Sequence, residues 1–111
     1  MKVRDLLDIS FVKALSNEDT LDNEIKDLYT SDLLSWVMGH VHQEKTCLLT
    51  VLNTINAVAV ATLLDMSAII FCEGVIPTID IIAKANEEGI AILTSTTSSI
   101  ATAREIIKHE G

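Results

Sequence analysis

The second half of the chain alternates between short apolar segments and longer segments with helical periodicity. The apolar segments and the helical patterns that follow them are, in chain order, 46–52 and 53–64, 68–72 and 78–88, and 90–93 and 98–109. Such alternation is typical of parallel βα units. Strands that are apolar on both faces indicate a sheet that is covered on both sides. The pattern therefore predicts an α/β fold with three layers.

The first half of the chain carries weaker signals. Val3, Leu6 and Leu7 fall on one face of a short helix, and 11–15 is a strand candidate that ends in an acidic turn. Residues 24–30 mix apolar and charged positions, as an exposed or edge strand does. We expect these two strands to join the parallel part at an edge. The result is a mixed, mostly parallel sheet of about five strands with helices on both faces.

Polar residues next to the helical patterns suggest caps. A helix over 33–41 would be capped by Ser31 or Asp32, and the helix after residue 52 by Asn53 or Thr54. That second helix is apolar nearly all round, so we expect it to be central and buried. Further cap candidates are Gly89 at the end of one helix and Ser98 or Ser99 at the start of the last.

Composition limits the class of protein. The 111 residues predict one domain, 1–111, and the net charge of −8 disfavours binding to nucleic acid or to an anionic membrane. The longest apolar stretch, 55–71, is interrupted by polar residues and is too short for a membrane span. With no signal peptide in the sequence, we expect a cytoplasmic protein whose Cys47 and Cys72 are reduced core thiols.

The candidate binding residues lie where predicted strands end, because ligands of parallel α/β sheets bind at that edge. They are Asn53, Thr54, Cys72, Glu73, Gly74, Thr94, Ser95 and Thr96. The structural alternative is a helix cap for Asn53 and Thr54, a solvated loop charge for Glu73, and the hydroxyls of a turn for 94–96. Cys72 has no neighbouring base in the sequence that would activate it as a nucleophile. No catalytic set and no cofactor motif emerge.

Two other features carry alternatives. His40 and His42 would share a face and could chelate a metal if they lay on a strand, but at a helix end they would diverge and be solvated. We favour the helix end and expect no metal site. Trp36 is the only tryptophan, and it either anchors an interface or packs in the core.

Four strings together resemble the DRTGG domain family, and the outline is similar to the N-terminal domain of HPr kinase/phosphorylase. They are KVRDLLDI (2–9), VKALSNEDTLDNEI (12–25), YTSDLLSWVM (29–38) and the segment 50–95. The resemblance covers nearly the whole chain. It implies a small α/β module that occurs beside CBS domains, in some pyrophosphatases and in some phosphate acetyltransferases. Such modules are regulatory or dimer-forming, with no established catalysis.

The residues that name the family are mostly replaced. The Asp-Arg pair falls on Asn53 and Thr54, and the Thr-Gly-Gly triplet falls on Cys72, Glu73 and Gly74, of which only Gly74 is retained. The missing arginine removes the group best suited to pair with a phosphate.

The resemblance implies a non-catalytic regulatory or ligand-sensing module that forms a homodimer and takes a protein partner or a small polar ligand. The alternative is a purely structural module that acts through a surface bearing Trp36. An enzyme has little support from the residues.

Overall fold

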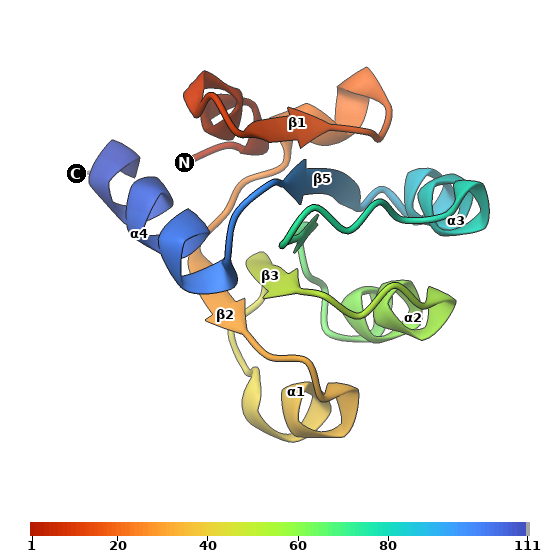
Figure 1. Ribbon diagram of the computed structural model, residues 1–111. Coiled ribbons are helices and arrows are strands. Elements are labelled where there is room, and N and C mark those ends of the chain that lie inside the picture. Colours follow the sequence, from red (N-terminus) through yellow and green to blue (C-terminus); the bar gives the residue numbers. More distant parts are fainter. Residues whose placement is uncertain (111) are drawn as a thin grey trace.

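The computed structural model describes residues 1–110 and contains one five-stranded sheet in the order β1-β5-β4-β3-β2 (Figure 1). Strands β2 to β5 are parallel, and β1 is antiparallel to β5. The strands are β1 (Val12–Ala14), β2 (Asp27–Thr30), β3 (Thr46–Thr50), β4 (Ala68–Phe71) and β5 (Ala91–Ser95). The predicted mixed, mostly parallel sheet is confirmed.

Helices cover both faces of the sheet, which confirms the three layers. Three α-helices pack on one face, and α4 with two 3₁₀-helices packs on the other (Figure 1). The first group is α1 (Leu34–His40), α2 (Ile55–Leu63) and α3 (Ile79–Glu88). The second is α4 (Ser99–Glu110), η1 (Val3–Asp8) and η2 (Glu18–Asp22). Among residues 1–110, no helix has the length and apolarity needed to cross a membrane.

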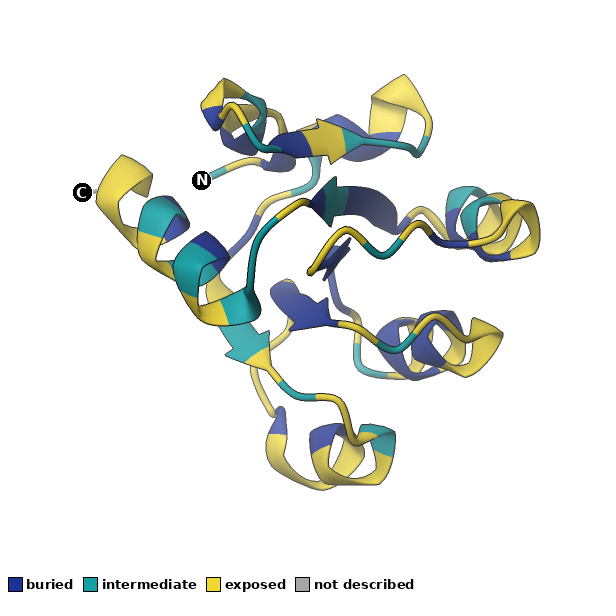
Figure 2. Cartoon of the chain, in the orientation of Figure 1, coloured by how far each residue is buried: buried dark blue, intermediate teal, exposed yellow. Residues whose placement is uncertain are grey.

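The core is divided by the sheet into two clusters. Along β3, Cys47 and Leu49 pack toward η1 and α4, whereas Leu48 packs toward α1, α2 and α3. Every residue of β3 and β4 is buried, as Figure 2 shows. This two-sided burial is the physical reason that the strands have no polar alternation in the sequence.

The first two strands do not share an edge, contrary to the simplest form of the prediction. β1 lies at one edge, where Leu15 donates its amide to the Ile92 carbonyl at 2.8 Å, and β2 lies at the other, parallel to β3. The helix between β2 and β3 explains this placement, because a strand–helix–strand crossover puts both strands in parallel.

The prediction that α2 is buried on all sides is wrong. Ala57, Val58 and Ala61 are buried, but Ile55 and Leu63 on the opposite side are exposed. The three helices form a single layer, so the outer side of α2 faces solvent. A uniformly apolar sequence gives no signal of which side is buried.

The caps were predicted with mixed success. Ser98 accepts the Ala101 amide at 3.1 Å, and Gly89 ends α3 with φ +73°, as expected. By contrast, the N-cap of α1 is Leu33, while Asp32 Oδ1 instead accepts Thr50 Oγ1 and the Val51 amide, each at 2.8 Å. Thr54 is the N-cap of α2 but makes no side-chain cap bond.

Candidate functional site

The carboxyl ends of β3, β4 and β5 bring the predicted site residues to one edge of the sheet, because these strands are parallel. We call this the strand-end edge and define it as the loops 51–54, 72–78 and 95–98. The loops are joined by hydrogen bonds: Asn53 Nδ2 donates to the Ile76 carbonyl at 3.1 Å, and the Glu73 amide donates to the Thr97 carbonyl at 2.8 Å.

The predicted residues divide into surface and buried groups at this edge. Asn53, Thr54, Glu73, Gly74 and Thr96 are exposed, and Thr94 is partly exposed. Cys72 and Ser95 lie beneath them, with no exposed surface. A ligand on this edge would therefore touch the first group, while the second group supports it from below.

Ser95 belongs to a buried hydroxyl cluster. Its Oγ lies 2.7 Å from Thr102 Oγ1 and accepts the Thr97 amide at 3.3 Å, and Thr102 Oγ1 donates to the Ser98 carbonyl at 2.7 Å. The cluster joins the end of β5 to the first turn of α4. The hydroxyl residues 94–96, which we expected to contact a ligand, therefore serve in part to hold β5 and α4 together.

Cys72 has the properties of a structural thiol. Burial raises its pKa, and burial likewise raises the pKa of Cys47, so both thiols stay protonated at neutral pH. Cys72 Sγ points to the Ile70 carbonyl at 3.7 Å. A buried, protonated thiol is a poor nucleophile.

Glu73 is held in a strained backbone conformation. It has φ +61°, and Gly74 beside it has φ +74°. A left-handed conformation costs a residue with a Cβ about 1–2 kcal/mol relative to glycine. The resemblance predicted two consecutive glycines at these positions, and the geometry gives the physical reason for that pair.

Replacing Glu73 with glycine is expected to stabilise the protein by about 1 kcal/mol, because the relief of backbone strain exceeds the entropy that glycine adds to the unfolded chain. Urea denaturation measures the change. Glu87→Gly, at an α3 position with ordinary helical backbone, serves as the control and should destabilise. A Glu73→Gly variant less stable than the parent would contradict the strain argument.

The strand-end edge is acidic. Asp32 accepts the Val51 amide, Glu73 lies in the loop 72–78, and Asp80 is in the first turn of α3. The three loops contain no lysine or arginine. The Glu73 amide donates to the Thr97 carbonyl, and the Gly74 amide donates to the Ser95 carbonyl. Neither amide is therefore free to bind an anion. The side-chain charge of this edge therefore favours an uncharged or cationic hydrogen-bonding group over a phosphate.

Trp36 lies on the surface and not in the core. Its side chain is 52% exposed, and its ring stacks on His40 with centroids 3.8 Å apart. Met38 lines a groove of about 400 Å³ between α1 and α2, together with Leu34 and Leu63. Because residues two apart lie about 200° apart around a helix, Trp36 faces away from α2, toward the outer margin of the helical layer.

His40 is the last residue of α1 and His42 follows the helix, so the two histidines lie at a helix end and not on a strand, as predicted. His40 is committed to the stack on Trp36, and its Nδ1 lies 2.8 Å from the Trp36 carbonyl. No cluster of metal-ligating side chains occurs among residues 1–110.

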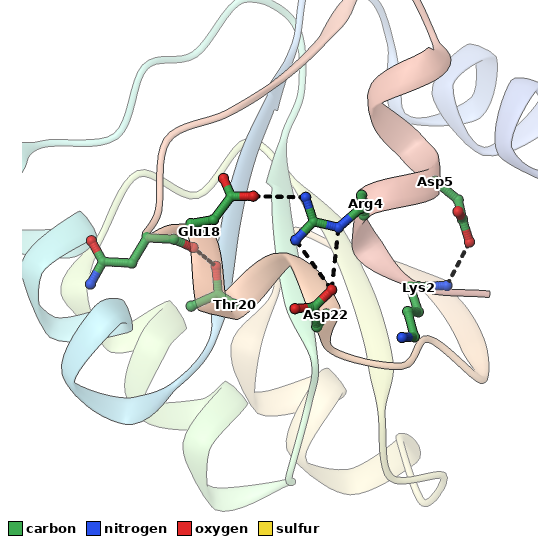
Figure 3. A network of polar contacts seen from close by, with 7 residues as sticks. Lys2, Arg4, Asp5, Glu18, Thr20 and Asp22 are labelled. Carbon is green, nitrogen blue, oxygen red and sulfur yellow. Dashed lines mark hydrogen bonds and ion pairs between the residues drawn. The ribbon is translucent and has the colours of Figure 1, made fainter.

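A second polar network ties the two 3₁₀-helices together (Figure 3). Arg4 donates to Glu18 at 2.8 Å and to Asp22 at 3.2 Å. All three side chains are largely exposed, so the network contributes modestly to stability. It joins two segments of the chain, η1 and η2.

Sequence comparisons name no family for this chain. No family model matches it, and no curated protein matches it. A solved structure with a similar fold contains the CBS and DRTGG domains of the regulatory region of the Clostridium perfringens pyrophosphatase, complexed with the activator diadenosine tetraphosphate. The TM-score is 0.77 at 19% identity, over 97% of this chain and 46% of that one.

This chain thus spans about half the length of its structural neighbour. The likeness supports the DRTGG-like fold that the sequence predicted. At this level of identity it shows the fold alone.

Proposed function

We propose that this chain is a non-catalytic regulatory module of the DRTGG type that forms a homodimer and binds a small polar ligand at the strand-end edge. The observation that carries the ligand site is Glu73, an exposed carboxylate held with φ +61° where glycine would cost less. Backbone strain of this kind is found at functional positions. Among residues 1–110, Lys45 and Asp65 also have positive φ, and of the three residues only Glu73 lies at the strand-end edge. The fold shared with the regulatory region of a pyrophosphatase supports the regulatory role.

The chemistry of the edge narrows the ligand class. Glu73 offers a carboxylate, Thr54 and Thr96 offer hydroxyls, and Asn53 adds an amide carbonyl. Because no cation stands among them, we propose an uncharged or cationic ligand with several hydrogen-bond donors. Adenosine and spermidine are suitable probes of these two kinds, and AMP and ATP are their anionic counterparts.

Thermal unfolding in the presence of these probes tests the proposal. A ligand at about ten times its Kd stabilises the folded state by about 1.4 kcal/mol, which raises Tm by about 4 °C or more in a domain of this size. We expect adenosine or spermidine to raise Tm, and AMP and ATP to have no effect. Glu73→Gln should remove the spermidine response.

Glu87→Gln, a matched change of an exposed carboxylate on α3, should leave the response intact. A response to AMP or ATP alone would contradict the proposed ligand class. No response to any of the four probes would favour the second candidate function.

That second candidate is a structural pairing module without a small-molecule ligand. The specific observation in its favour is the exposed Trp36–His40 stack at the outer margin of the helical layer. Large exposed aromatic side chains are enriched at the centres of protein interfaces.

Trp36→Glu is expected to weaken self-association at least tenfold, because an aromatic side chain that the dimer contact would bury is replaced by a charge in a protein that is already acidic. Sedimentation equilibrium measures the dissociation constant. An unchanged constant would remove Trp36 from the interface.

A further inference from the structure

We infer that the homodimer forms by antiparallel pairing of strand β2 with β2 of a second copy, which joins the two sheets into one. This inference rests on the homodimer of the proposed function and specifies its interface. It starts from the sheet order β1-β5-β4-β3-β2, in which β2 is a terminal strand.

The backbone of β2 has hydrogen-bonding groups available for a partner strand. Ser31 donates its amide to the Leu49 carbonyl of β3 at 3.3 Å. The backbone N–H and C=O groups of successive strand residues point to opposite sides of the strand. The backbone groups of Tyr29 therefore face β3, like those of Ser31, and the backbone groups of Leu28 and Thr30 face outward. The Leu28 amide bonds to Asp27 Oδ1 at 2.9 Å, a local contact that a partner carbonyl can replace.

The opposite edge of the sheet is less suited to pairing. β1 has three residues, one fewer than β2, and its central residue is the exposed Lys13. A lysine in the middle of a short edge strand is a common protection against strand addition. Residues 28–31 of the β2 edge carry no charge.

One register fits the charges of β2. Centred on Tyr29, it pairs Leu28 with Thr30 of the second copy, so the outward backbone groups exchange hydrogen bonds. The same register places Lys26 level with Asp32 of the second copy, whose Oδ1 also accepts Thr50 Oγ1 and the Val51 amide of its own chain. Centring on Leu28 would instead place Glu24 opposite Asp32, which like-charge repulsion disfavours.

Apolar side chains flank the open edge on both faces of the sheet. On one face, a cavity of about 230 Å³ between α4 and β2 is lined by the apolar Leu28, Ile106 and Ile107 and also by the charged Lys26, Asp27 and Glu110. Ile107 is 59% exposed. On the other face lies the margin of α1 that bears Trp36. Each copy carries a net charge of −8, so association is favoured where few acidic side chains meet, and the uncharged residues 28–31 meet this condition.

A disulfide trap tests the register directly. In the pairing centred on Tyr29, the two Tyr29 Cα atoms form a non-hydrogen-bonded pair about 4.5 Å apart, within the range of roughly 4.4–6.8 Å that disulfides span. Tyr29→Cys is therefore expected to give a covalent dimer on mild oxidation. Asp27→Cys is the control, since its two copies would lie about 13 Å apart.

The native thiols do not interfere with this trap, because Cys47 and Cys72 are buried.

A second pair of variants avoids any loss of Tyr29 packing. Thr30→Pro removes one outward amide without touching the bonds to β3, whereas Thr30→Val retains it. We expect Thr30→Pro to sediment near the monomer mass of 12.1 kDa and Thr30→Val to remain dimeric.

The outcomes separate this inference from the proposed function. Cross-linking of Tyr29→Cys together with dissociation of Thr30→Pro would support β2 pairing. A dimer that survives Thr30→Pro but dissociates in Met38→Glu would place the contact in the α1–α2 groove and overturn β2 pairing alone. A wild-type monomer at all concentrations would overturn both the dimer and this inference, while the thermal response to adenosine or spermidine would still test the ligand site.

Discussion

Replacing Phe71 with alanine is expected to lower the free energy of unfolding by about 3–5 kcal/mol. Phe71 ends the central strand β4, is fully buried and packs toward the layer of α1, α2 and α3. Its loss removes a large apolar surface and leaves a cavity that fixed neighbours on β3 and β5 cannot fill. Domains of this size have a total stability of about 5–15 kcal/mol, so the variant would be close to unfolding.

Urea denaturation followed by circular dichroism measures this change. Ile79→Ala is the matched control, because Ile79 is 83% exposed at the start of α3 and should lose less than about 0.5 kcal/mol. Similar losses in the two variants would mean that the division between core and surface described above is incorrect.

Replacing Ser95 with alanine is expected to cost about 1–3 kcal/mol, although only one oxygen atom is removed. Ser95 Oγ bridges the Thr97 amide and the Thr102 hydroxyl in a region without solvent access. Without it, these polar groups stay buried with fewer partners. The effect should be accompanied by faster amide hydrogen exchange at the start of α4, because the hydroxyl cluster joins β5 to that helix.

Thr96→Ala provides the comparison, since Thr96 is adjacent and exposed. It should change stability by less than about 0.5 kcal/mol. If Thr96→Ala were as costly as Ser95→Ala, the separation of the hydroxyl run into supporting and surface residues would fail.

The sequence predicted the parallel part of the fold well because strong signals coincided there. The apolar runs of β3, β4 and β5, the Gly89 C-cap and the Ser98 N-cap all agree with the structure. The placement of β1 and β2 at opposite edges was harder to predict. It depends on long-range pairing, which local patterns do not encode.

The sequence predicted where the candidate site residues lie, but not which of them are buried. Parallel strands placed Asn53, Glu73 and Thr96 at one edge, as strand order requires. Burial of Cys72 and Ser95 beneath that edge depends on which way each residue points at a strand end, where the two-residue alternation gives way to a loop. Asp32 was missed as a member of this region because its position before a helix suggested a cap, yet its carboxylate bonds to the end of β3.

The division of the first 30 residues between the two edges of the sheet has a consequence for folding during synthesis. Ser16 accepts a hydrogen bond from the amide of Ile92, 76 residues later in the chain, so β1 can dock only after most of the chain has emerged from the ribosome. Contacts over such long sequence separations slow folding. We therefore expect the β3–α2–β4–α3–β5 segment to form before β1 docks, and amides of β1 to gain hydrogen-exchange protection last during refolding.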